Sequence, residues 1–134
     1  MSSCGHTLSG RNVLPDELDQ LVQAVEGWCD SGHIDIVLTT GGTGLGPRDV
    51  MPEVMARAMD FDVPGIGEAI RGQTLSITPM AMLSRARAGV RGRTLIINLP
   101  GSPKGVREGL AVVLPVLAHA VDILRERHSG PHPR

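Results

Sequence analysis

The residues with the clearest chemical potential lie in a glycine-rich segment from Thr39 to Asp49. It reads TTGGTGLGPRD, with glycine at positions 41, 42, 44 and 46. Glycine permits positive φ angles and lets the backbone approach a ligand closely, and the amides of such a loop can point at phosphate oxygens. Arg48 adds a fork-shaped donor and Asp49 a carboxylate. The segment therefore predicts an anion-binding loop at the end of a strand, with a tight surface turn as the alternative.

Two common glycine motifs are excluded for this loop. No lysine follows the glycines, so the segment is not a P-loop. The dinucleotide fingerprint G-x-G-x-x-G also fails, because Gly42 and Gly44 pair correctly but the sixth position is Pro47.

A second candidate site runs from Asn98 to Lys104, with the sequence NLPGSPK. An apolar strand ends there, a glycine turns the chain, and a helix begins with Ser102 and Lys104. A helix N-terminus of this kind attracts anions. The alternative is a plain strand-to-helix connection in which Asn98 is a turn-former.

Alternating helices and strands must position these two loops. Hydrophobic periodicity and capping residues predict strands over 34–40 and 93–99, and helices over 15–29, 52–59, about 65–74, 79–87 and 102–127. Pro115 must interrupt or kink the last helix. The alternation implies an α/β three-layer sandwich around a mostly parallel sheet. We expect one domain over residues 1–134, with a disordered tail over 128–134.

Composition excludes several function classes. Aromatic residues make up 1% of the chain and the net charge is −1, so neither a base-stacking platform nor a basic field for nucleic acid or an anionic membrane is expected. Cys4 and Cys29 read as free thiols of a reducing compartment. No signal peptide or membrane span is visible, so a cytoplasmic location is expected. The five histidines form no spaced cluster of metal ligands.

Three stretches of the chain strongly resemble the MoaB/Mog family of molybdopterin adenylyltransferases, to which the gephyrin adenylyl-transfer domain belongs. They are TTGGTGLGPRDVMPE, TPMAMLSRARAGVRG and TLIINLPGSPKGVRE, within a likeness that runs from about Gly10 to Leu124. The resemblance implies a homotrimer, sometimes a hexamer. It also implies a reaction that joins the terminal phosphate of molybdopterin to the AMP part of Mg-ATP and releases pyrophosphate. A following enzyme would then insert molybdate.

The resemblance also assigns roles to residues, position by position. Asp16 of PDE and Asp49 of PRD match the important acids of the family, so they are the expected catalytic residues and tentative Mg²⁺ ligands. The residues expected to contact nucleotide or pterin are Thr40, Gly41, Gly42, Thr43, Gly44, Arg48, Ser84, Asn98, Pro100, Gly101, Ser102 and Lys104. The position of Asp16 alone indicates no more than an acidic residue in a first helical turn, where a negative charge stabilises the helix N-terminus.

The chain departs from the family pattern in two places. Met51 replaces a threonine that would cap the helix beginning at Pro52, at a cost of roughly 1 kcal/mol. The family also begins with a strand ending in a Ser-Asp-Arg-like motif, followed by a helix, and no segment here matches that unit. We therefore expect a chain that lacks the first strand and helix and is inactive or poorly folded alone.

Two other functions stay open at this point. One is a non-catalytic trimeric module of the same fold that binds a pterin or another protein. The other is a nucleotide-pyrophosphate hydrolase related to competence-damage proteins, which share a similar glycine loop.

Overall fold

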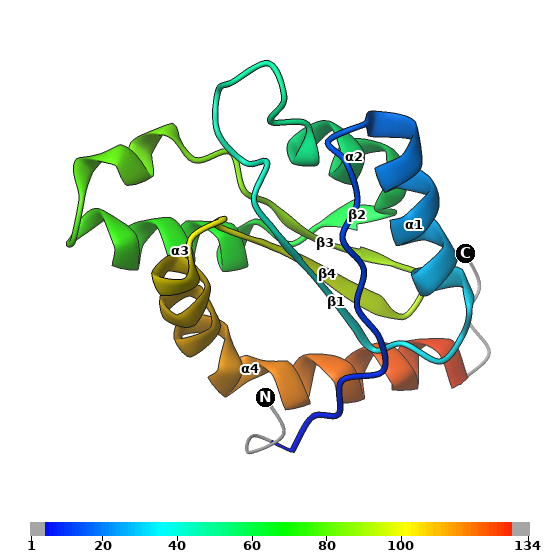
Figure 1. The fold of residues 1–134 in the computed structure, drawn as a ribbon. Helices are drawn as coiled ribbons and strands as arrows, with labels where there is room; N and C mark the ends of the chain where they lie inside the picture. The colour runs from blue at the N-terminus through cyan, green and yellow to red at the C-terminus, as the bar shows by residue number, and fades with distance from the viewer. Residues whose placement is uncertain (1–4, 130–134) are drawn as a thin grey trace.

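The computed structural model describes residues 5–129, drawn as a ribbon in Figure 1. In chain order the elements of this part are α1 (Leu18–Asp30), β1 (Ile36–Thr40), α2 (Met51–Ala58), β2 (Phe61–Asp62), α3 (Pro64–Leu75), the 3-10 helix η2 (Pro79–Leu83), β3 (Ala88–Arg91), β4 (Thr94–Leu99) and α4 (Pro103–Ser129).

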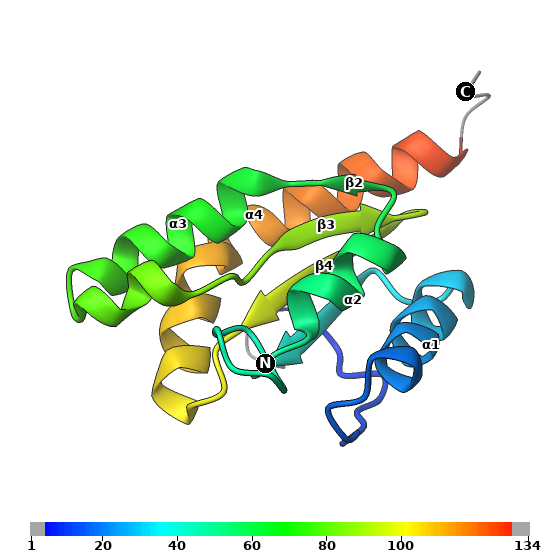
Figure 2. The same cartoon turned by 90° about the horizontal axis from the view of Figure 1, so that it is seen from above.

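These elements form three layers, which confirms the expected α/β sandwich. Helices α1 and α2 cover one face of the sheet, and α3 and α4 cover the other (Figure 2). The strand order is β1-β4-β3-β2. Parallel pairing holds between β1 and β4, where Val37 lies opposite Ile96, whereas β3 and β2 continue the sheet antiparallel. Only Gly92 and Arg93 connect β3 to β4, and so short a connection requires antiparallel strands.

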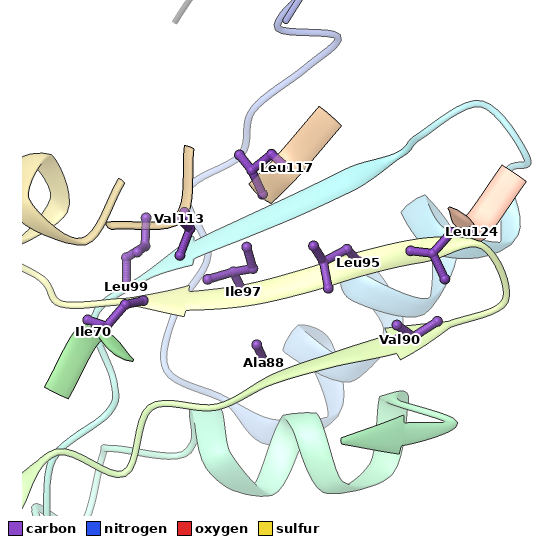
Figure 3. Close-up of a cluster of buried hydrophobic side chains, with 9 residues drawn as sticks. All are labelled: Ile70, Ala88, Val90, Leu95, Ile97, Leu99, Val113, Leu117 and Leu124. Carbon is purple, nitrogen blue, oxygen red and sulfur yellow. The ribbon is translucent and has the colours of Figure 1, made fainter. Parts of the chain in front are cut away.

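The core consists of two clusters, one on each face of β4. All six residues of β4 are buried, as expected of a strand covered on both sides. Toward α3 and α4 lies the cluster of Figure 3, in which Ile97 and Leu117 are fully buried. Toward α1 and α2 lies the second cluster, which contains Ile96 and Met55. Because β4 contributes side chains to both clusters, the strand that leads into the second candidate loop is packed on both faces.

Helix α4 changes direction about half-way along its length (Figure 1). Pro115 lies inside it, which agrees with the expected kink. The helix continues to Ser129, and the rest of the expected disordered tail, residues 130–134, lies outside the described residues.

The predicted helix over 79–87 is wrong in its second half. The 3-10 helix ends at Leu83, and β3 begins at Ala88. Local propensity does not reveal this strand, because Ala88 and Gly89 are poor strand formers and pairing with β4 and β2 decides the conformation. Gly89 is required at its position, since a Cβ there would lie 2.8 Å from the backbone oxygen of Phe61 and would also overlap the sulfur of Met59.

The first helix begins later than predicted, at Leu18. The Glu17 side chain accepts hydrogen bonds from the backbone amides of Asp19 and Gln20, so Glu17 caps the helix. Asp16 therefore precedes the helix. At the other end of α1, Cys29 is a free and buried thiol, and burial raises its pKa to about 11.

Within residues 5–129 no helix combines the length and the apolar character needed to span a membrane.

An ion pair between Asp35 and Arg125 ties the start of β1 to α4. Arg125 donates two hydrogen bonds to the carboxylate, at 3.0 and 2.6 Å, and this bonding lowers the pKa of Asp35 below its usual value of 3.8. A lowered folded-state pKa means that the stabilisation is present above pH 4 and is lost as the pH falls through the folded value. The Asp35 side chain is 28% exposed, so solvent screening limits the contribution.

We expect Asp35→Asn to lower the free energy of unfolding by about 1 kcal/mol at pH 7. The difference from the wild type should shrink as the pH falls below about 4. Urea unfolding at pH 7 and pH 3 checks this. A difference that is the same at both pH values would show that the charge of Asp35 does not stabilise the fold.

Candidate ligand site at the ends of strands β1 and β4

Both candidate loops lie at the same edge of the sheet. Strands β1 and β4 are parallel and in register, with Thr40 opposite Leu99, so both carboxyl ends meet there. The amide of Gly41 donates to the carbonyl of Leu99 at 2.9 Å. A Cβ on Gly101 would lie 3.4 Å from the Gly41 Cα. Ligands of α/β sheets bind in this position, so the two loops form one candidate site.

The glycine loop turns through a left-handed conformation. Gly41 and Gly42 have φ angles of 85° and 72°, which residues with a side chain rarely adopt. The carbonyl of Gly42 accepts a hydrogen bond from the amide of Met51 at 3.0 Å. The Met51 side chain is buried, with its Cγ 3.0 Å from a Cβ placed on Gly42.

Met51 is therefore a packing residue beneath the loop, inside the first turn of α2. The N-cap of this helix is Val50, which makes no side-chain cap bond. The expectation that residue 51 occupies the cap position is wrong. The helix starts one residue earlier than predicted, since the carbonyl of Val50 accepts the first helical hydrogen bond, from the Val54 amide at 2.9 Å, while the Met51 amide donates to Gly42.

The carboxylate of Asp49 folds back over its own loop. Its Oδ2 accepts a hydrogen bond from the Gly46 amide at 2.8 Å. A Cβ at Gly44 would lie 2.8 Å from this oxygen, and a Cβ at Gly46 would lie 3.0 Å from it. Glycine at both positions therefore makes room for the carboxylate. Its Oδ1 has no hydrogen-bond partner within the described part of the chain.

A third segment, Ser84 to Arg87, packs against the glycine loop. The backbone amide of Arg85 donates to the carbonyl of Thr43 at 2.7 Å, and the Arg85 guanidinium reaches Gly44 and Asp49. The hydroxyl of Ser84 accepts from the amide of Ala86 at 3.2 Å. All three segments that carry the family resemblance thus meet at one end of the sheet.

Asn98 lies beneath this junction and is 1% exposed. Its Nδ2 donates to the Thr39 hydroxyl at 2.8 Å. Its Oδ1 accepts from the Arg87 amide at 3.1 Å. In this structure the side chain joins β1, β4 and the segment before β3, and both of its polar atoms are used in doing so.

The second loop begins helix α4. The hydroxyl of Ser102 accepts from the Gly105 amide at 3.0 Å, which is an N-cap contact. Pro100 packs on Gly105, where a Cβ would lie 2.8 Å from the proline Cβ. Lys104 is 71% exposed, and its ammonium lies 3.9 Å from the Glu108 carboxylate. Arg48 is exposed and has no hydrogen bond or ion pair among residues 5–129.

A pocket of about 250 Å³ opens beside the first loop, between α1, β1 and the segment that precedes α1. Its wall includes Thr40, Gly41 and Asp16, together with the apolar Val37 and Trp28. Asp49 is not part of this wall, and no hydrogen bond joins it to Asp16. The structure therefore brings the loops together but does not bring the two acids into contact.

Comparison with known proteins identifies the family. The family described as "Probable molybdopterin binding domain" matches residues 1–119. A structure of the molybdopterin biosynthesis enzyme MoaB from Thermus thermophilus is 48% identical, with a TM-score of 0.82 over 93% of this chain and 77% of that chain. The chain belongs to the MoaB/Mog family.

Curated members of the MoaB/Mog family are also similar to this chain. The molybdopterin adenylyltransferase of Helicobacter pylori is 42% identical over 84% of this chain and 64% of its own length. Gephyrin of Dictyostelium discoideum is 44% identical over 90% of this chain and 17% of its own length. The chain thus spans less than two thirds of the length of these relatives.

The acids of this MoaB/Mog chain offer hard oxygen donors for Mg²⁺, which typically binds one or two carboxylates and takes its other ligands from waters and substrate phosphates. Asp49 has one carboxylate oxygen without a partner among residues 5–129, and Asp16 is exposed. Among the described residues no three His, Cys, Asp or Glu side chains gather as a metal site. Two separate carboxylates fit a Mg²⁺ ion that is bound together with a nucleotide better than they fit a Mg²⁺ ion held by the protein alone.

Sequence reasoning assigned no role to Arg85, and it placed Thr39 at the start of the glycine-rich segment without predicting its partner. Arg85 bonds to backbone carbonyls that lie 36 and 41 residues away, and no sequence pattern encodes such partners. Thr39 stands at the end of a strand, where its hydroxyl could equally face solvent, and only its bond to Asn98 reveals its role.

Proposed function

We propose that this chain is a molybdopterin adenylyltransferase that transfers AMP from ATP to the terminal phosphate of molybdopterin. The observation that carries the proposal is the convergence of the glycine loop, the 84–87 segment and the 98–104 loop at one sheet edge. A relative named molybdopterin adenylyltransferase, which is 42% identical, supports it.

The reaction requires two anions to approach each other in line. An oxygen of the pterin phosphate attacks the α-phosphorus of ATP, the bond from that phosphorus to the bridging oxygen breaks, and pyrophosphate leaves. The site must therefore neutralise charge and hold both phosphates. Backbone amides of the glycine loop and the N-terminus of α4 supply fixed partial positive charge. Arg48 and Lys104, both exposed, supply mobile cations beside them.

We assign Asp49, with Asp16, as the residues that would hold Mg²⁺ bound to the nucleotide. When bound, the ion neutralises charge on the phosphate oxygens. The chain's own contribution is the loop that orients Asp49. The Gly46 amide holds one carboxylate oxygen, and the other has no hydrogen-bond partner among residues 5–129.

Thr40 and Gly41 border the pocket that also contains Asp16, and we assign this wall to the substrate. Ser84 and Gly101 lie at the same junction and complete the proposed binding surface. We further propose that the chain is one domain, that it acts in the cytoplasm, and that an enzyme that inserts molybdate takes its product.

The second candidate function is binding of the pterin without AMP transfer. It is favoured by the separation of the two acids, since Asp16 lines the pocket and Asp49 does not. The two functions differ in their product.

Incubation of the chain with molybdopterin and Mg-ATP, followed by chromatography, tests the proposal. We expect an AMP-linked pterin. Pterin binding without an adduct would favour the binding module. Hydrolysis of ATP without an adduct would reject the transferase and favour a nucleotide hydrolase.

We also propose that the chain forms a homotrimer. Apolar side chains are exposed on the arm formed by the end of α3 and η2, including Ile77, Met80 and Met82, the last of which is 70% exposed. Exposed apolar side chains grouped in this way often mark an interface.

We expect sedimentation at micromolar concentration to give a trimer, and Met82→Asp to give a monomer because a charge would have to be buried. Val116→Asp is the control, since Val116 is also exposed but belongs to α4 and not to this arm. A wild-type chain that sediments only as a monomer would contradict the proposal.

A further inference from the structure

The Arg85 side chain lies across the glycine loop and contacts its middle, at Gly44, and its end, at Asp49. Its Nε donates to the carbonyl of Gly44 at 2.8 Å, and its Nη2 donates to the carbonyl of Asp49 at 2.7 Å. Its backbone amide donates to the carbonyl of Thr43 at 2.7 Å. Three carbonyls of one loop are thus held by a single residue from another segment.

A fourth contact fixes the guanidinium itself. Its Nη1 donates to the Glu53 carboxylate at 2.8 Å. Glu53 lies in the first turn of α2, so the guanidinium is held between the loop and the helix that follows it. The side chain is 37% exposed, which leaves one of its faces open to solvent.

The bonded carbonyls determine where the amides of the loop point. Residues 5–129 contain no cis peptide bond, and in a planar trans peptide the C=O and the following N–H point in opposite directions. Holding the carbonyls of Thr43, Gly44 and Asp49 therefore directs the amides of Gly44, Leu45 and Val50 away from Arg85.

Those three amides have no hydrogen-bond partner within the described part of the chain. Neighbouring amides of the loop are satisfied, since Gly46 donates to Asp49 and Met51 donates to Gly42. Some amides of the loop are thus hydrogen-bonded to the loop itself. The other three have no partner among residues 5–129, and their direction is set by the carbonyls that Arg85 holds. Free amides of this kind bind anions.

We propose that Arg85 is a positioning residue that presents the amides of Gly44, Leu45 and Val50 to a phosphate of the substrate. It acts through the loop and does not itself contact the substrate. The proposal rests on the proposed function in that the phosphate belongs to ATP. The proposal also predicts that Arg85 orders the loop when no ligand is bound, and this prediction does not depend on the proposed function.

The test compares Arg85→Ala and Arg85→Lys with the wild type. Lysine keeps the charge but lacks the planar fork that reaches two carbonyls at once. Arg57→Ala is the matched control, because Arg57 is a surface arginine of α2 that, among residues 5–129, pairs only with Asp19. If Arg85→Ala does not fold, Arg85→Lys carries the comparison.

The first measurement is ¹⁵N relaxation of the loop amides without ligand. We expect order parameters of about 0.85 in the wild type and in Arg57→Ala, and below about 0.6 at Leu45 in both Arg85 variants. The second is calorimetric titration with ATP. We expect the dissociation constant to rise about tenfold or more, equivalent to at least one lost hydrogen bond. Methylguanidinium added to Arg85→Ala should restore part of the affinity.

A loop that stays ordered in both Arg85 variants would overturn the proposal, as would unchanged affinity for ATP. A wild-type chain that does not bind ATP would also overturn it. A wild-type chain that binds ATP but forms no AMP-linked pterin would reject the proposed transferase alone, because the two measurements on Arg85 do not depend on turnover.

Discussion

Replacement of Asp49 by asparagine is expected to lower the rate of AMP transfer by about 10²–10³-fold, which is typical for removal of one electrostatic contributor to a reaction. Asparagine keeps the size of the side chain and can still accept the Gly46 amide bond, but it loses the negative charge. The loop should therefore keep its shape, because Gly44 and Gly46 make the same room for either side chain.

Affinity for molybdopterin should change little in Asp49→Asn, which separates a catalytic role from a binding role. Steady-state rates and a pterin titration measure the two effects. Asp19→Asn is the matched control, because Asp19 is an exposed carboxylate in a surface ion pair with Arg57. Turnover of Asp49→Asn equal to that of the wild type would remove Asp49 from the mechanism. For Asp16→Asn we also expect a lower rate of AMP transfer.

Replacement of Asn98 by alanine is expected to lower the free energy of unfolding by about 2–4 kcal/mol, through loss of two hydrogen bonds and the cavity left behind. The amide of Arg87 and the hydroxyl of Thr39 both lose their partner. This loss is a large part of the total stability of a domain, which is about 5–15 kcal/mol. Urea unfolding gives the value directly.

Asn12→Ala is the control for this substitution, because Asn12 is exposed and makes no hydrogen bond within the described residues. We expect its unfolding free energy to lie within about 0.5 kcal/mol of the wild type. If Asn98→Ala were as stable as Asn12→Ala, the bridge between β1, β4 and the 84–87 segment would not hold the site together.

The elements with strong hydrophobic patterns could be predicted from the sequence. Strand β4 reads as an apolar run and lies buried on both faces, and α4 shows helical spacing with an internal proline. Strands β2 and β3 could not be predicted. β2 has two residues, and β3 begins with two poor strand formers, Ala88 and Gly89, the second of which has no room for a Cβ beside the backbone oxygen of Phe61.

For the candidate site, glycine content and turn chemistry indicate two loops that could bind anions, and that role stays a prediction. The four glycines of the first loop and the strand-to-helix turn of the second are local signals, and they meet at Gly41 and Gly101. The direction of each side chain could not be predicted. Asn98 was expected to line the ligand site, yet in this structure it is bonded internally. Such outcomes depend on three-dimensional neighbours that the spacing along the chain does not encode.

The most direct test of the proposed function follows each phosphorus atom of ATP. The chain is incubated with molybdopterin, Mg²⁺ and ATP labelled with ³²P at either the α or the γ position, and the pterin and phosphate products are separated. The proposed transfer predicts that α-label appears on the pterin and that γ-label appears only in pyrophosphate. Label from the γ position on the pterin, or an unlabelled pterin alongside hydrolysed ATP, would contradict the assignment of this chain as a molybdopterin adenylyltransferase.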